Sequence, residues 1–271
     1  MENEYGVLEK VIVSEPQYMR ITEIINEVQK KYAKENIDTT AALKQHRAFV
    51  KTLKNEGVEV LYLHNHKELN EQVFTRDLGF VVDKQLCVSN LKVHIRKKET
   101  DFLIQMLNKQ KLDYYEFQHE IEGGDVLVHQ NTIFIGINNR TTMDAVKEIK
   151  QKFPSKQVDV IQLTEGILHL DCVFNIIDEQ TALIYKDGID QESFLRMKQK
   201  FNLILITKDE QEKMASNVLS IGNRKIITLF NQERINTLLK RRGFTVMEHD
   251  LSEIIKSGGA FRCCTFPIIR R

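Results

Sequence analysis

Pairs of short apolar runs, each joined by polar turn residues, recur along this chain. Their β-branched and aromatic residues predict β-hairpins, which follow one another roughly every 45 residues, a period typical of propellers and other repeat proteins. The four pairs are LGFVVDKQLCVSN (78–90), GDVLVHQNTIFIG (124–136), CVFNIIDEQTALIY (172–185) and NVLSIGNRKIITLF (217–230). Their predicted turns are Asp83-Lys84, Gln130-Asn131, Asp178-Glu179 and Gly222-Asn223.

Between the hairpins the spacing of apolar residues becomes helical. Helices are predicted over residues 97–110, over 141–153 with a threonine cap, and over 231–243, from an Asn231 cap to a left-handed Gly243. Another short strand is expected after each helical stretch, at residues 112–117, 157–163, 201–207 and 244–250. The two ends of the chain, 6–14 and 262–270, would form a fifth strand pair.

The repeated unit is therefore a hairpin, a helix and a strand, present about five times. Each unit has an apolar face that it cannot bury alone, and stacking the units around an axis buries all of these faces. The chain has three prolines and no low-complexity linker, so we expect one α/β domain over residues 1–271. A doubly wound parallel sheet is the competing architecture, but such a sheet would rarely need regular hairpins.

The charge balance argues against a nucleic-acid partner. The chain has 39 basic and 38 acidic residues, mixed along its length, so no strongly charged surface is expected. The first residues, MENEYGVLEKVIVSEP, lack the basic and apolar regions of a secretory signal. No apolar run approaches the roughly 20 residues that cross a bilayer. We therefore expect a cytosolic protein with reduced thiols, without a disulfide between Cys263 and Cys264.

Acidic residues and one histidine interrupt the apolar runs beside the hairpins. They are Asp77 in VFTRDLGFVV, Glu122 and Asp125 in HEIEGGDVLV, and His169 and Asp171 in GILHLDCVFNII. A ring of repeats would bring these segments together near its axis. A turn or cap role is the alternative for Asp77 and Asp125. If 169–171 is a strand, His169 and Asp171 project to the same side.

The end of the chain, SGGAFRCC, offers a candidate nucleophile. Cys263 follows Arg262, whose positive charge would favour the reactive thiolate. For Cys263 and Cys264, burial in the core is the alternative. Cys87 and Cys172 are expected to be core residues, and Cys172 would alternate to the side of the strand opposite His169. Adjacent cysteines have poor geometry for a closed zinc site.

One thiol, one imidazole and several carboxylates suit a substrate with a delocalised positive charge. In a cysteine protease the additional carboxylates would repel the developing oxyanion. A guanidinium is planar and pairs bidentately with carboxylates, which leaves its central carbon open to a thiolate. The histidine could then protonate the departing amine and activate water for a second step.

TRD, EGGD, HLD and the terminal GG-x-x-x-C, in this order, resemble the guanidino-group-modifying superfamily. It contains arginine deiminases, dimethylarginine dimethylaminohydrolases, agmatine deiminases and amidinotransferases, and the resemblance covers about Val7 to Arg270. It implies a five-bladed β/α propeller, the pentein fold, with no metal or organic cofactor. It also implies that Cys263 is the nucleophile and that His169 is the general acid and base. Glu122 would support the histidine and contact the guanidinium.

The same resemblance implies the substrate-binding residues. Asp77 and Asp171 would bind the guanidinium. HIRKKET (94–100) and IGINNRTT (135–142) resemble stretches whose arginines, here Arg96 and Arg140, contact the far end of the substrate. A solvated helix end is the alternative for both arginines.

The activity implied is hydrolysis of a guanidino C–N bond of arginine or an Nω-methylated arginine through a cysteine adduct, giving citrulline with ammonia or a methylamine. The chain length is similar to that of dimethylarginine hydrolases, whereas TRD and HLD look more like the deiminases. An amidinotransferase and a non-catalytic pentein binding module are the alternatives. We expect a small-molecule partner and no membrane, and leave a homodimer open. The segment from Pro16 to Asp38 could supply a lid.

Overall fold

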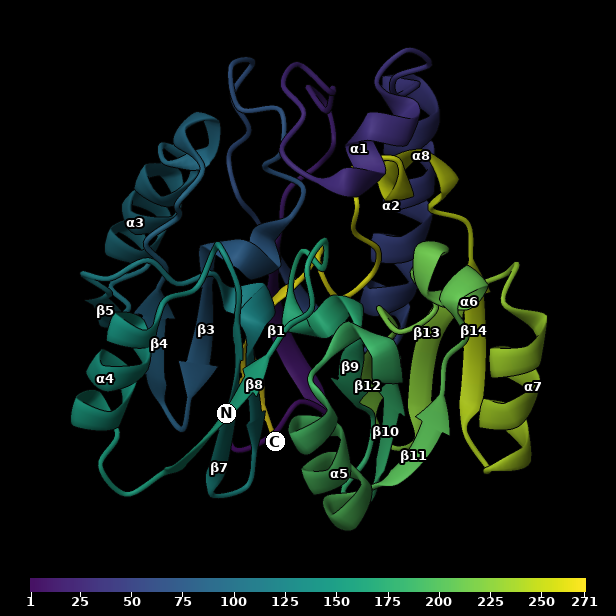
Figure 1. Ribbon diagram of the computed structural model, residues 1–271. Helices are drawn as coiled ribbons and strands as arrows, with labels where there is room; N and C mark the ends of the chain where they lie inside the picture. The colour runs from purple at the N-terminus through teal and green to yellow at the C-terminus, as the bar shows by residue number, and fades with distance from the viewer.

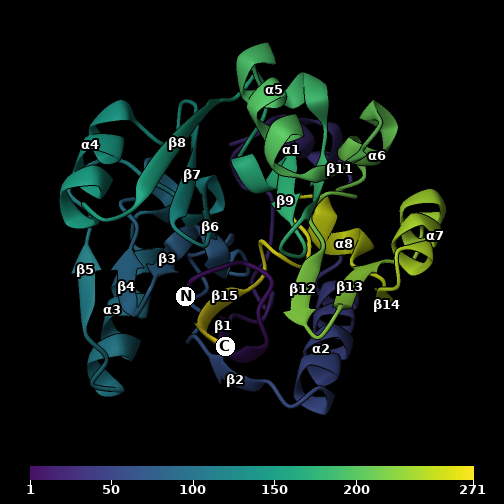
Figure 2. The ribbon, with the colours of Figure 1, turned by 90° about the horizontal axis from the view of Figure 1, so that it is seen from below.

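The computed structural model describes residues 1–271 and contains five separate three-stranded sheets around one axis (Figures 1 and 2). In every sheet the first two strands are antiparallel and the third is parallel to the second. The repeat of hairpin, helix and strand is thus confirmed, and the fold is the five-bladed β/α propeller.

The five sheets differ little in size. In order of hydrogen bonding they are β15 (Phe266–Arg270), β1 (Leu8–Val13) and β2 (Glu59–Tyr62); β3 (Gly79–Val82), β4 (Gln85–Val88) and β5 (Tyr114–Glu116); β6 (Val126–His129), β7 (Thr132–Ile137) and β8 (Gln157–Gln162); β9 (Phe174–Ile176), β10 (Thr181–Ile184) and β11 (Asn202–Leu205); β12 (Leu219–Gly222), β13 (Lys225–Leu229) and β14 (Thr245–His249).

The hairpin turns lie close to the predicted positions. Asp83 and Gln130 adopt the left-handed conformation, with φ of 51° and 52°. The fourth turn is displaced by one residue, to Asn223 and Arg224, because Gly222 still belongs to β12 and lies at an irregularity of the ladder.

Eight helices accompany the sheets; most of them lie on the outside of the ring (Figure 2), whereas α1 lies over the end of the axis, at the top of Figure 1. They are α1 (Glu27–Tyr32), α2 (Thr39–Asn55), α3 (Glu99–Lys109), α4 (Met143–Lys152), α5 (Gln191–Lys200), α6 (Lys208–Glu212), α7 (Glu233–Arg241) and α8 (Ser252–Ile255). The threonine cap of α4 is confirmed, since the Thr142 side chain accepts the Ala145 N–H. The Asn231 cap is wrong: α7 begins after Gln232, which makes no capping hydrogen bond. No helix is both long and apolar enough to cross a bilayer.

Pairing of the two chain ends closes the ring. β1 and β15 run antiparallel, with Ile12 opposite Phe266, and the termini lie side by side at the bottom of Figure 1. The predicted C-terminal strand is shorter than expected, since residues 261–264 form a turn before β15. Cys263 therefore lies on a turn that faces the axis of the ring, and not in the predicted strand.

The apolar core lies between the sheets and their covering helices. Its largest cluster has 22 buried residues, including Val11, Phe49 and Phe261, and takes in both Cys263 and Cys264. The turn that carries Cys263 is therefore packed on one side against the core that α2 shares with β1.

The buried carboxylate of Glu4, near the start of the chain, connects several segments on the inside of the ring through ion pairs. Glu4 is 1% exposed and forms ion pairs with Arg76 (3.3 Å) and Arg262 (2.9 Å). Burial would raise the pKa of Glu4, but the charges of Arg262 and Arg76 lower it to about 2. Arg76 also donates from Nε to the Gly123 carbonyl (3.0 Å), so Glu4 is linked to three separate inner segments.

We expect Glu4→Ala to destabilise the fold by about 3–5 kcal/mol, because it leaves the buried guanidinium of Arg76 without its paired carboxylate and removes one of the two carboxylates that pair with Arg262. Urea unfolding measures the change. The matched control is Glu2→Ala, since Glu2 is exposed; its effect should stay within about 0.5 kcal/mol. Equal midpoints for the two variants would contradict the role given to Glu4.

Candidate active site

Four motif segments occupy equivalent positions in four of the five units. FTRD leads into the 3-10 turn η1 (Thr75–Leu78), EGGD contains η3 (Gly123–Asp125), and HLD leads into η4 (Leu170–Cys172). Each of these turns precedes the first strand of its sheet, and the turn with Cys263 likewise precedes β15. Because the units surround one axis, equivalent turns meet at one end of it.

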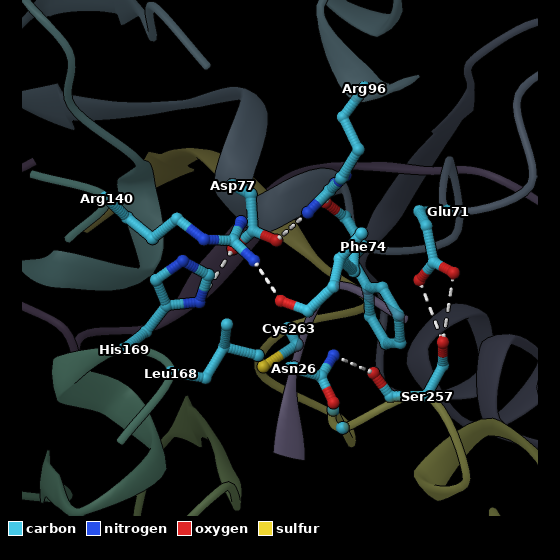
Figure 3. Close-up of a pocket in the computed structure, with 13 residues that line it drawn as sticks. Asn26, Glu71, Phe74, Asp77, Arg96, Arg140, Leu168, His169, Ser257 and Cys263 are labelled. Atoms are coloured by element: carbon cyan, nitrogen blue, oxygen red, sulfur yellow. Dashed lines mark hydrogen bonds and ion pairs between the residues drawn. The ribbon is translucent and has the colours of Figure 1, made fainter. Parts of the chain in front are cut away.

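The turns enclose a small cavity of about 10 Å³ (Figure 3). Cys263, His169 and Asp77 line it together with Arg96 and Arg140. Two further predicted site residues, Glu122 and Asp171, lie behind this lining and contact His169 and Cys263 respectively. All seven side chains are buried, and the structure brings them together.

His169 is surrounded by carboxylates. Its Nε2 lies 2.7 Å from Glu122 Oε2, and its Nδ1 lies 3.5 Å from Asp77 Oδ1. Burial alone would lower the pKa of His169, but the carboxylates of Asp77, Asp125 and Glu122 outweigh it and raise the pKa to about 10. For Glu122 the opposite holds: burial would raise its pKa, and the hydrogen bond and charge of His169 lower it. The pair is therefore an imidazolium and a carboxylate at neutral pH.

The strand expected at residues 169–171 is wrong, although the side chains of His169 and Asp171 do project together, with ligand atoms within 4.8 Å of each other. His169 is extended (φ −143°), but it precedes η4, and Asp171 lies inside that 3-10 turn. The turn directs Asp171 to Cys263: its carboxylate oxygens lie 3.8 and 3.9 Å from Cys263 Sγ and one lies 3.4 Å from Arg262 Nε. The period-two rule fails here because the chain turns within these residues.

For the same reason Cys172 does not point away from the site. It is buried as expected, yet its Sγ lies 3.7 Å from Asp171 Oδ1. The neighbouring Cys263 thiol, burial and Asp171 all raise the pKa of Cys172, so it stays a thiol. Burial likewise raises the pKa of Cys264, which belongs to the core.

The side chains of Arg96 and Arg140 are buried, so the alternative that they lie at solvated helix ends is wrong. Arg96 pairs with Asp77 (2.6 Å) and with Glu99 (2.8 Å). Arg140 contacts both oxygens of Glu122 (3.2 Å each) and donates to the Ile25 carbonyl (2.8 Å).

The glycines of EGGD allow close approach of protein groups. A Cβ on Gly124 would lie 2.9 Å from the imidazole ring of His169, and one on Gly123 would lie 2.2 Å from the Arg76 carbonyl oxygen. Asp125 has the structural role left open above: it accepts the Thr141 hydroxyl (2.6 Å) and the Leu170 N–H (2.9 Å).

The sequence analysis missed two residues of this region, Glu71 in the cavity lining and Asn217 beside Cys263. Glu71 lines the cavity and accepts hydrogen bonds from Ser257 and from Gln29 of α1, and burial raises its pKa to about 7. Asn217, before β12, lies against Cys263 Sγ at 3.1 Å. Neither residue had a motif or a periodic position to mark it.

The segment 16–38 covers the cavity, as a lid would. Ile25 and Asn26 line it, and Asn26 donates to the Ser257 carbonyl (3.0 Å). Only residues 27–32 of this segment are helical. Whether the segment moves stays a prediction.

Two triads come close enough to hold a metal ion. They are His169, Asp171 and Cys172, and Asp77, Glu122 and His169, with ligand atoms within 4.8 Å of one another. Both sets depend on His169, whose Nε2 is already bonded to Glu122. An imidazolium is a poor ligand, because a metal needs the unprotonated ring. That the protein works without a metal stays a prediction.

Solved structures share the fold of this chain. The N-terminal domain of ArgZ with bound product, an arginine dihydrolase from cyanobacteria, has a TM-score of 0.89 at 21% identity and covers 96% of this chain and 97% of its own. A dimethylarginine dimethylaminohydrolase adduct with 4-chloro-2-hydroxymethylpyridine has a TM-score of 0.78 at 21% identity, covering 96% and 99%. Five units of this kind and the ordered motifs define a pentein of the guanidino-group-modifying superfamily.

Comparison with known sequences identifies the family of this chain within the superfamily. The family model N,N dimethylarginine dimethylhydrolase, eukaryotic, matches residues 15–270, and the chain belongs to this family. The uncharacterized protein YkgA of Bacillus subtilis is 41% identical over 268 residues, which are 98% of this chain and 94% of YkgA. An arginine deiminase of Bacillus thuringiensis is 24% identical over 252 residues, covering 73% of this chain and 61% of the deiminase.

We expect the free energy of unfolding to fall as the pH rises from about 6.5 to about 10. In this window the unfolded chain has lost the His169 proton, whose ordinary pKa is about 6.5, whereas the folded protein keeps it up to about pH 10. The folded state binds more protons, so its stability decreases with pH. Urea unfolding across this range measures the slope.

The variant His169→Asn isolates this contribution, since it lacks the titrating group. Its stability should decrease less over the window than that of the parent. Glu122→Gln should move the decrease to lower pH, because it removes one of the carboxylates that hold the proton. Parallel curves for all three proteins would contradict the charge state given to His169.

Proposed function

We propose that this protein is a hydrolase acting on the guanidino group of arginine or of an Nω-methylated arginine. Cys263 forms a covalent adduct with the guanidinium carbon, ammonia or a methylamine leaves, and water releases citrulline. The observation that carries the proposal is the single cavity shared by Cys263, His169 and Asp77. Membership of the family supports a guanidino substrate.

The carboxylates suit a planar cation. Asp77 Oδ1 is buried and accepts no hydrogen bond, and Asp171 lies within 4 Å of the sulfur. A guanidinium that donates to these two carboxylates would have its central carbon close to Cys263. Its charge would also offset the local excess of negative charge and favour the thiolate.

The first half of the reaction uses the proton on His169. The Cys263 thiolate attacks the central carbon, and a C–S bond forms. The imidazolium gives its proton to the departing nitrogen, the C–N bond breaks, and the amine leaves behind a thiouronium-type adduct. Because carboxylates hold this proton at neutral pH, the histidine is ready to act as an acid.

The second half regenerates the enzyme. The imidazole, now neutral, takes a proton from water, and the resulting hydroxide adds to the same carbon. The C–S bond then breaks, Cys263 leaves as a thiolate, the hydroxyl proton passes to solvent, and citrulline is formed. Glu122 stabilises the imidazolium that reappears, since it contacts Nε2 at 2.7 Å.

Substrate entry requires a rearrangement of the closed cavity, which has room for about one water molecule. A substrate guanidinium would compete with Arg140 for Glu122. Arg140 would thereby be released to bind the substrate carboxylate, with Arg96 nearby and Glu71 available for an amino group. The lining thus offers cationic side chains for the carboxylate and an anionic side chain for the amino group of a zwitterionic amino acid.

Arginine suits the head-group site better than dimethylated arginine. The carboxylates of Asp77 and Asp171 accept N–H donors, and each N-methyl group removes one of them. A methylated nitrogen would leave a buried carboxylate oxygen unpaired, which is costly. The cytosol is the proposed location, because a catalytic thiol stays reduced there.

We expect the purified protein to release citrulline from arginine, with a lower kcat/KM for dimethylarginine. Cys263→Ala should lose activity by at least about 1,000-fold, because no nucleophile remains to form the covalent adduct. Cys87→Ala is the matched control, since Cys87 is a core cysteine of another unit. Product detection by mass across arginine, methylarginines and agmatine measures both expectations.

Other outcomes separate the alternatives. A new guanidino product in the presence of an acceptor amine would make the protein an amidinotransferase. A Cys263→Ala variant as active as the parent would remove the proposed mechanism. No turnover of any guanidino compound, with arginine analogues failing to protect Cys263 from alkylation, would favour a binding module.

Metal removal should leave the activity unchanged. We expect dialysis against EDTA to alter kcat by less than about twofold, because the proposed steps use only the thiol, the imidazole and carboxylates. Restoration of a lost activity by added zinc would contradict this and would identify one of the two triads as a metal site.

A further inference from the structure

Asn217 is held in a fixed orientation beside the nucleophile. Its Oδ1 accepts the backbone N–H groups of Ala260 and Cys263, both at 3.2 Å. Because an N–H can donate only to an acceptor, these two bonds identify the oxygen of the amide. The nitrogen, Nδ2, must therefore face Cys263 Sγ, at 3.1 Å, and the Asp171 carbonyl, at 3.3 Å.

The backbone around Asn217 is fixed from both sides. Asn175 of β9 donates to the carbonyls of Ser216 and Val218, each at 2.8 Å, and the Ser216 hydroxyl donates to the Cys172 carbonyl at 2.6 Å. The amide is thus set before any substrate arrives, and a preorganised donor loses no further freedom during the reaction.

We propose that Asn217 is a catalytic residue whose amide N–H stabilises the thiolate of Cys263. A thiolate accepts hydrogen bonds much more strongly than a thiol, so this donor favours the reactive form. The contact is with the sulfur itself, and Asn217 is not among the residues that line the substrate cavity. This inference rests on the proposed function, since it takes Cys263 to be the nucleophile.

The need for such a donor follows from the charges that face the sulfur. Asp171 and Cys172 approach it from η4, and the carboxylate of Asp171 disfavours a second negative charge nearby. Arg262, the preceding residue, has its guanidinium paired with Glu4 and Asp171. The remaining charged or titratable groups around the cavity are His169, Asp77, Glu71, Arg96 and Arg140.

The test compares Asn217→Asp with the parent. Aspartate keeps oxygen acceptors for the two backbone N–H groups, removes the N–H donor and adds a carboxylate beside the sulfur. Asn217→Leu, which is similar in size, removes the donor without adding a charge, so both variants should show the effect described below; an effect in Asn217→Asp alone would be one of the added charge and would overturn the proposal. We expect alkylation of Cys263 by iodoacetamide at neutral pH to slow roughly 10- to 100-fold, as for loss of one hydrogen bond to a charged group. The midpoint of its pH profile should rise by about one to two units. With arginine as substrate, kcat should fall while KM changes little.

The matched control is Asn236→Ala in α7. Asn236 is also buried and donates to a backbone carbonyl, that of Leu229, so its loss should lower stability without moving the alkylation profile. An Asn217→Asp protein that is folded and alkylates Cys263 like the parent would overturn the proposal and leave Asn217 a structural residue.

A second measurement does not depend on the folding of a variant at position 217. In the ¹⁵N spectrum of the full chain, the side-chain amide of Asn217 should shift as Cys263 titrates, and the shift should disappear in Cys263→Ala. An amide signal that does not respond to the state of Cys263 would overturn the proposal. Because neither readout needs turnover, an Asn217 effect in a protein that hydrolyses no guanidino compound would refute the proposed function alone.

Discussion

Charged groups buried around one cavity are the constraint on which this structure depends. An unpaired ion in such a place would cost several kcal/mol, so every charge there needs a partner. Glu122 and Asp77 hold the imidazolium of His169, and Arg96 and Arg140 in turn pair with these two carboxylates. The result is an alternating network in which no member can change charge without affecting its neighbours.

The repeat explains how distant segments build this network. Each motif forms the turn before the first strand of its unit, and these strands surround the axis. Glu4 links two of the turns through its ion pairs with Arg76 and Arg262. Closure of the ring by β1 and β15 brings the cysteine turn opposite the histidine turn. The geometry of the candidate site is thus a consequence of ring closure, and the site and the fold have to form together.

The fold and most of the site could be predicted because they have local signals. Hairpin patterns at a regular period predicted the five units, and short ordered motifs marked Cys263, His169 and Glu122. The orientation of Asp171 and Cys172 was not predictable from alternation, because the chain turns through η4 at that point. Asn217 and the Arg140–Glu122 pair depend on contacts between different units, which no local pattern contains.

The central claim is that the sulfur of Cys263 bonds covalently to the carbon of a guanidinium head group. Rapid acid quenching during turnover of arginine, followed by mass spectrometry of the peptides, tests it directly. The account predicts that the peptide containing Cys263 transiently gains the mass of arginine less ammonia and loses it as arginine is consumed. Citrulline release that continues with Cys263 chemically blocked, or an adduct on another residue, would contradict it.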